Sequence, residues 1–67
     1  MKYMYIISIR NPVKGNHTLT DIITANPGDT RATLFLLAYT KACQQLGVDP
    51  ASNTGVEFFY LEPLELP

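Results

Sequence analysis

The chain has 67 residues and a mass of 7.5 kDa, with 46% hydrophobic residues, 16% charged residues and a formal net charge of −1 at pH 7. A chain of this size buries only about 60% of its unfolded surface, so a second domain, a large enclosed active site and a deep cofactor cleft are not expected. The charged fraction is below the usual value of about 25%, which favours neither disorder nor a basic surface for nucleic acid. We therefore expect a single small domain over residues 1–67.

The sequence points to a cytoplasmic protein. Cys43 is its one cysteine, so it cannot form the intrachain disulfide framework on which small secreted domains usually depend. The apolar stretch at residues 3–9 is too short for the hydrophobic region of a signal peptide. The longest other apolar run, residues 34–39, is far shorter than the roughly 20 residues needed to cross a bilayer. The sequence therefore predicts no membrane segment.

The first 25 residues predict a β-hairpin. Residues 3–9 are apolar on both faces of the expected strand, which is typical of a central strand with a layer packed on each side. Residues 11–16 contain Asn, Pro and Gly, whose backbone preferences favour a hairpin loop. Residues 17–25 predict the second strand, and the threonines on one of its faces are typical of an edge strand.

Residues 30–46 predict a helix, with Asp29 or Thr30 as its N-terminal cap and Gly47 as its C-terminal cap. Apolar residues recur there at helical spacing and define the expected core stripe. The stripe consists of Ala32, Phe35, Leu36, Tyr39, Ala42, Cys43 and Leu46. Leu34 and Leu37 project away from this stripe, beside Lys41, so both are expected to be exposed.

Residues 56–62 predict a third strand that is again apolar on both faces, and the prolines of residues 63–67 favour an extended tail. A right-handed crossover through the helix places the third strand parallel to the second, on the far side of the first. The predicted fold is therefore α+β: a ββαβ chain with a three-stranded antiparallel sheet of order 2-1-3 and one helix packed on one face. One helix covers one face, so something else must cover the other.

The sequence offers little for catalysis or metal binding. His17 is the one histidine and Cys43 is expected in the core, so neither a zinc site nor a cysteine nucleophile is favoured. Asp21 and Glu57 are expected on strands that the first strand separates, where solvated carboxylates are the simpler interpretation. The four glycines are isolated and form no phosphate-binding loop. We expect no enzymatic activity, no metal and no cofactor.

Excess apolar surface is the more informative feature. It comprises the outer helix side at Leu34 and Leu37, the open sheet face, and Leu64 and Leu66 of the tail, unless the tail folds back over that face. Protein binding is therefore favoured. A sheet-surface nucleic-acid binder is a weaker alternative, because aromatic side chains could stack on bases but the five basic residues are scattered.

Two resemblances accompany this interpretation. The run from Tyr3 through the turn at Pro27, Asp29 and Thr30 to Phe59 resembles the first ββαβ portion of a β-grasp (ubiquitin-like) domain, although later strands and a C-terminal Gly-Gly are lacking. The compact ββαβ plan and the aromatic third strand ending at Glu62 and Pro63 are similar to small phage and mobile-element proteins, which include anti-CRISPR inhibitors. That second resemblance implies a non-enzymatic inhibitor that occludes a surface of a larger host defence complex in the host cytoplasm.

We therefore predict a protein-binding module that contacts a partner through its sheet edge, outer helix face and acidic tail. The predicted partner-binding residues are Tyr3, Tyr5, Leu34, Leu37, Lys41, Tyr60, Glu62 and Glu65. The principal alternative is a structural homodimer in which two open sheet faces pack together.

Overall fold

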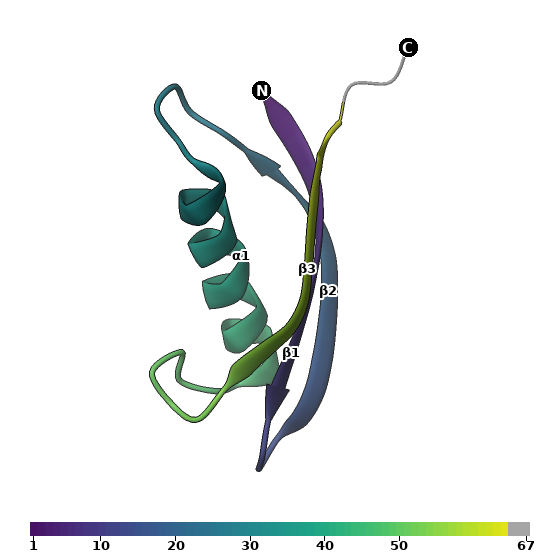
Figure 1. The fold of residues 1–67 in the computed structure, drawn as a ribbon. Coiled ribbons are helices and arrows are strands. Elements are labelled where there is room, and N and C mark those ends of the chain that lie inside the picture. The colour runs from purple at the N-terminus through teal and green to yellow at the C-terminus, as the bar shows by residue number, and fades with distance from the viewer. Residues whose placement is uncertain (65–67) are drawn as a thin grey trace.

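The computed structural model describes residues 1–64. It contains strand β1 (Lys2–Asn11), strand β2 (Gly15–Thr24), helix α1 (Arg31–Leu46) and strand β3 (Gly55–Pro63). The sheet order is β2-β1-β3, and β1 is antiparallel to both neighbours. Helix α1 lies on one side of the twisted sheet, and the start of β1 and the end of β3 lie at the same end of the molecule (Figure 1). The predicted α+β ββαβ fold is confirmed.

The β1–β2 hairpin is longer than the sequence predicts, because its strands extend to a three-residue turn. The register runs from Lys2 opposite Thr24 to Asn11 opposite Gly15. Gly15 has a φ of 88°, a left-handed conformation that glycine adopts without a steric cost. The Oδ1 of Asn11 accepts hydrogen bonds from the backbone N–H groups of Val13 and Lys14, at 2.9 and 3.0 Å. The side chain of Asn11 thus fixes the turn.

Helix α1 has the caps that its flanking residues predict. Thr30 is extended and its Oγ1 accepts a hydrogen bond from the N–H of Thr33 at 3.2 Å, which satisfies one free donor of the first turn. Gly47 has a φ of 81°, and its N–H donates to the carbonyl of Cys43 at 2.9 Å. These two residues set the ends of the helix.

The core lies between α1 and the inner face of the sheet. Tyr5, Ile7 and Ile9 of β1 are buried there against Ala38, Ala42 and Cys43 of α1. Helix α1 lies over β1 and β2, and partly buried side chains close the edges of the core. These flanking side chains are Leu19, Ile23, Phe35, Tyr39, Leu46, Val48, Phe59 and Leu61.

The predicted phase of the helix is wrong at three positions. Leu34 is buried, with 4% of its surface exposed, whereas Leu36 is 59% exposed and Ala32 is also exposed. The buried row runs through Leu34, Ala38 and Ala42, spaced four residues apart, and the two alanines let the helix approach the sheet closely. Every residue from 34 to 39 is apolar or aromatic, so the apolar pattern alone does not set the phase.

Strand β3 begins and ends one residue beyond its predicted limits. Its register against β1 shifts between Ser8 and Ile9. At its far end the N–H of Leu64 donates to the carbonyl of Lys2 at 2.9 Å. Up to Leu64, then, the predicted tail continues alongside β1 and does not fold over the sheet. The rest of that tail, residues 65–67, lies outside the described residues.

Candidate protein-binding surface

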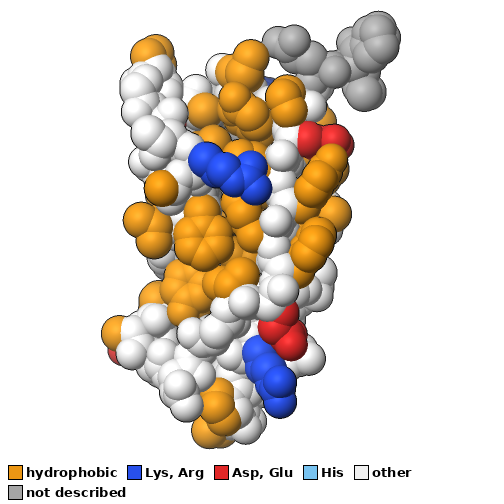
Figure 2. All heavy atoms as spheres, viewed as in Figure 1, with side chains coloured by type: hydrophobic (Ala, Val, Ile, Leu, Met, Phe, Trp, Pro, Cys, Tyr) orange, Lys and Arg blue, Asp and Glu red, His pale blue; other side chains and the backbone are white. Residues whose placement is uncertain are grey.

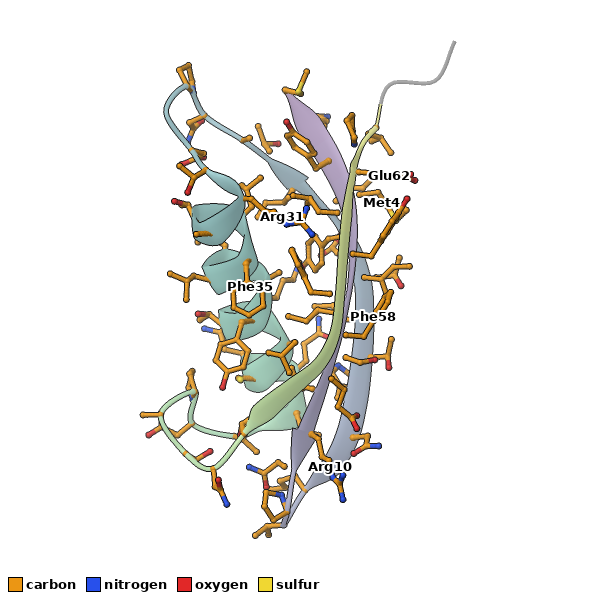
Figure 3. All side chains as sticks on the ribbon, viewed as in Figure 1. Met4, Arg10, Arg31, Phe35, Phe58 and Glu62 are labelled. Atoms are coloured by element: carbon orange, nitrogen blue, oxygen red, sulfur yellow. The ribbon has the colours of Figure 1, made fainter. Side chains whose placement is uncertain are left out.

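The face of the sheet opposite α1 carries an apolar surface that no described residue covers. Its apolar side chains come from alternate positions of all three strands, and we call this surface the open face. They are Met4 and Ile6 of β1, Ile22 of β2, and Phe58 and Tyr60 of β3. Ile22 and Phe58 are each 52% exposed and Tyr60 is 41% exposed. Met4 and Phe58 point away from the helix, on the side opposite Phe35 (Figure 3).

The strand register arranges the open face in cross-strand rows. Met4 lies between Ile22 and Glu62, and Ile6 lies between Thr20 and Tyr60. The next row places Ser8 between Thr18 and Phe58, and the Oγ atoms of Ser8 and Thr18 are 2.6 Å apart. Apolar side chains therefore concentrate on β1 and β3, whereas the β2 side carries threonines.

Charged groups lie at both ends of the open face. Glu62 is at one end and accepts a hydrogen bond from the hydroxyl of Tyr60, at 2.7 Å between Oε2 and the phenolic oxygen. This bond to the carboxylate raises the pKa of Tyr60, because it stabilises the protonated phenol. Arg10 lies toward the other end of β1, where Asn16 and Gly55 flank it. Apolar rows with polar groups at their margins are typical of protein-binding surfaces.

Two of the predicted binding residues belong to the core. Tyr5 is 2% exposed and Leu34 is 4% exposed, so neither offers an accessible side chain at the surface of the folded chain. Tyr5 lies on the strand face that α1 covers, and burial raises the pKa of its hydroxyl. Leu34 is buried because of the helix phase described above. The expected exposure of Leu34 is therefore wrong, and burial argues against a partner-binding role for both residues.

The other predicted residues are spread over several surfaces. Tyr60 and Glu62 lie on the open face, whereas Leu37 lies on the outer side of α1 with 51% of its surface exposed. Tyr3 is half-buried and lies on the helix side of β1. Glu65 lies outside the described residues. The structure thus brings Tyr60 and Glu62 together and places Leu37 apart from them.

Lys41 forms an ion pair across the edge of the molecule. Its Nζ donates to Oδ2 of Asp21, so α1 is joined to β2 at this edge. The ammonium lowers the pKa of Asp21, and the Asp21 carboxylate raises the pKa of Lys41. Both side chains are partly exposed, at 49% and 34%, and the pair gives Lys41 a structural contact that the sequence does not reveal.

The predicted set omits four apolar members of the open face: Met4, Ile6, Ile22 and Phe58. Strand alternation could have identified Met4, Ile6 and Phe58 from the sequence. Their strands are apolar on both faces, and a single helix covers only one of these faces, so the apolar side chains of the other face remain uncovered. Ile22 is the one apolar residue on the threonine-rich face of β2, and only its register position beside Met4 links it to the others.

A second apolar strip lies at the surface between α1 and β3. Figure 2 shows hydrophobic side chains gathered between the helix and the strand, with a basic side chain across them. Phe35 packs edge-to-face on Phe59 at 5.1 Å between ring centroids and stacks on Tyr39 at 6.1 Å. The Arg31 guanidinium lies 5.4 Å from the Phe59 ring centroid, a cation–π distance. These side chains contact one another, so the strip closes the core and is less exposed than Phe58 or Ile22.

Residues 1–64 contain no pocket and no cluster of three or more His, Cys, Asp or Glu side chains that could hold a metal ion. Cys43 is fully buried as a free thiol. The ring Nε2 of His17 lies 3.2 Å from Oε1 of Gln45, which links β2 to the end of α1. Across the described part of the chain, no helix has the length and apolar character needed to cross a membrane.

Comparison of the chain with known proteins finds no relative. No family model, curated protein or solved structure matches the chain. The resemblance to phage inhibitors therefore stays a prediction, and the surfaces described above are the basis for any proposal about function.

Proposed function

We propose that this chain is a non-enzymatic protein-binding module. The observation that carries the proposal is the open face, where Ile22, Phe58 and Tyr60 are exposed by 41% to 52% on a sheet face that no described residue covers. Contiguous exposed apolar side chains with a polar margin are typical of a surface that another protein covers.

The open face is a better candidate than either sheet edge. On the β2 edge, Asp21 lies on the helix side of the sheet and pairs with Lys41, and inward charges of this kind oppose the addition of a further strand. On the β3 edge, the register shift and Pro63 interrupt the regular ladder of hydrogen bonds. Both edges thus carry features that discourage strand pairing, which supports binding through the face.

In its most concrete form, the proposal is a phage-type inhibitor that occludes a surface of a larger host defence complex, such as a CRISPR–Cas complex, in the host cytoplasm. Inhibition by occlusion requires accessible side chains and no catalytic group. The described residues offer two such surfaces on opposite sides of the molecule, the open face and the outer side of α1 at Leu36 and Leu37. The resemblance stated from the sequence supports this form at the level of a protein class.

A phage-plating assay tests the inhibitor form. The chain would be expressed in bacterial strains that each carry one active CRISPR–Cas system directed against the plated phage. We expect wild-type protein to restore plaques in at least one strain, and Leu37→Glu or Ile22→Glu to abolish that effect at an unchanged protein level. Val13→Ser is the matched control, because Val13 is 89% exposed in the hairpin turn and lies off both surfaces.

Failure of wild-type protein to restore plaques in any strain would overturn the inhibitor form. Restoration by wild type and equally by both surface variants would show that neither surface binds the host complex. The protein-binding proposal itself fails if open-face substitutions change neither plaque restoration nor the solution mass of the protein.

A further inference from the structure

We propose that the open face binds a second copy of this chain, with the two sheets packed face to face and their β1 strands antiparallel. This inference rests on the proposed function, because it names the partner of the same surface. A homodimer of open sheet faces is the principal alternative predicted from the sequence. Here that homodimer has a defined surface, a defined strand orientation and a pair of charged contacts.

The size of the open face suits a small dimer. Strands are spaced by about 4.8 Å and advance about 3.3 Å per residue, so three strands of about nine residues cover roughly 400 Å² in plan. Side chains that stand on the sheet raise the accessible area above its plan area. Two such faces together bury on the order of 1,000 Å², which is where specific interfaces begin. We therefore expect a weak dimer, with a Kd in the micromolar range.

The open face carries a carboxylate, Glu62, near one end, where Lys2 also lies by strand alternation, and a guanidinium, Arg10, toward the other end. Glu62 lies opposite Met4 in the register, and Arg10 lies toward the other end of β1. Consider a two-fold axis that lies in the interface, perpendicular to β1, between the rows of Ile6 and Ser8. This axis brings each Glu62 beside Arg10 of the partner subunit, so that one dimer contains two equivalent charge pairs.

The same axis pairs the aromatic side chains of β3 across the interface. It places Phe58 over Tyr60 of the partner subunit and Ile6 over Ser8 of the partner subunit, while the threonines of the two β2 strands face each other. Aromatic side chains then face each other along β3. Along β1 each apolar side chain lies over a polar one, and hydroxyl groups line the β2 margin. The two helices lie on opposite outer surfaces, where Leu36 and Leu37 remain exposed to a larger partner.

Charge reversal distinguishes this arrangement from other dimers. Met4 and Arg10 are roughly 20 Å apart along β1 at about 3.3 Å per residue, so Glu62 and Arg10 cannot compensate for each other within one chain. Arg10→Glu and Glu62→Arg should each weaken dimerisation by about tenfold or more, because each places two like charges together at both ends of the interface. The double variant Arg10→Glu/Glu62→Arg restores both pairs and should recover most of the dimer.

The experiment is sedimentation equilibrium or light scattering over a dilution series at low salt. Wild type should approach twice the monomer mass at high concentration, the single variants should stay near the monomer mass, and the double variant should return toward the dimer. Lys14→Glu is the control for Arg10→Glu, because it also replaces a basic residue by an acidic one but does so in the hairpin turn, off the open face. Circular dichroism would establish that each variant is folded.

Three results would overturn the inference: a wild type that stays monomeric at high concentration, a dimer that neither single reversal weakens, or a double variant that remains monomeric while folded. A monomeric wild type whose open-face variants lose plaque restoration would assign the open face to the host complex. That result would overturn the second copy and leave the proposed function standing.

Discussion

Asn11 and Thr54 join two loops that are far apart in the sequence. The Nδ2 of Asn11 donates to Oγ1 of Thr54 at 2.9 Å, while its Oδ1 accepts from two N–H groups of the hairpin turn. Asn11 is 7% exposed and is the one buried polar side chain among the described residues. The Tyr39 hydroxyl donates to the carbonyl of Thr54 at 3.3 Å, which ties the same loop to α1. One buried amide thus holds the hairpin turn against the segment that leads into β3.

Removing this amide should destabilise the fold. Asn11→Ala leaves the backbone N–H groups of Val13 and Lys14 without their side-chain acceptor and removes the hydrogen bond to Thr54. We expect a loss of about 1–3 kcal/mol in the free energy of unfolding. Thr54→Ala removes one of two contacts between the amide and the loop, because Nδ2 of Asn11 also lies 3.5 Å from Oγ of Ser52, and it should cost less. Urea denaturation would measure both losses. Asn16→Ala, at an exposed strand position, is the control, and an equal loss there would contradict the assigned role.

Leu34 and Leu36 test the phase of the helix. Leu34→Ala should lower the free energy of unfolding by about 2–5 kcal/mol, because it leaves a cavity in the core. Leu36→Ala, at 59% exposure, should change it by less than about 0.5 kcal/mol. Thermal and urea unfolding would measure the difference. If Leu34→Ala is nearly neutral and Leu36→Ala is costly, the helix has the phase that the sequence alone predicts.

Phe58 and Phe59 are identical neighbours on opposite faces of β3. Phe59 packs on Phe35 beneath Arg31, so Phe59→Ala should cost about 2–4 kcal/mol of stability, below the full value for a completely buried ring. Phe58 is 52% exposed, so Phe58→Ala should cost less than about 1 kcal/mol while it weakens dimerisation. Calorimetry and sedimentation on both variants would separate stability from association. Equal losses of stability would contradict the two-face assignment.

The Asp21–Lys41 pair should give the stability a dependence on acid pH. Lys41 holds the pKa of Asp21 below its usual value of 3.8 in the folded chain, so the unfolded chain binds more protons in this range. The contribution of the pair is present above pH 3.8 and is lost as the pH falls through the lowered pKa. The difference in stability between wild type and Asp21→Asn should therefore shrink in acid.

Urea denaturation at several acid pH values would measure this difference. Glu57→Gln removes an exposed carboxylate outside the ion pair and serves as the control. A constant difference between wild type and Asp21→Asn down to the lowest pH would show that the ion pair does not stabilise the fold.

Local features of the sequence determined the element order, the helix ends and the strand order. Thr30 and Gly47 carry the capping chemistry that ends α1, and each acts within a few residues of its position. Strand order followed because a right-handed crossover leaves one place for β3, on the far side of β1, and because the apolar residues on both faces of β1 suit a central position. The open face also followed, since one helix cannot cover two sides of a sheet.

Only the tertiary structure decided which apolar residues are buried. Residues 34–39 offer several helix faces of nearly equal hydrophobicity, and the close approach of Ala38 and Ala42 to β1 selects the one that buries Leu34. The partners of Lys41 and Asn11 lie 20 and 43 residues away in the sequence, so no local pattern reveals them. The composition of the open face was likewise decided by register, because Ile22 lies beside Met4 only when β2 pairs with β1. The pairing of strands that are distant in the sequence, which no single segment encodes, therefore determined which residues form the open face, on which the proposed function depends.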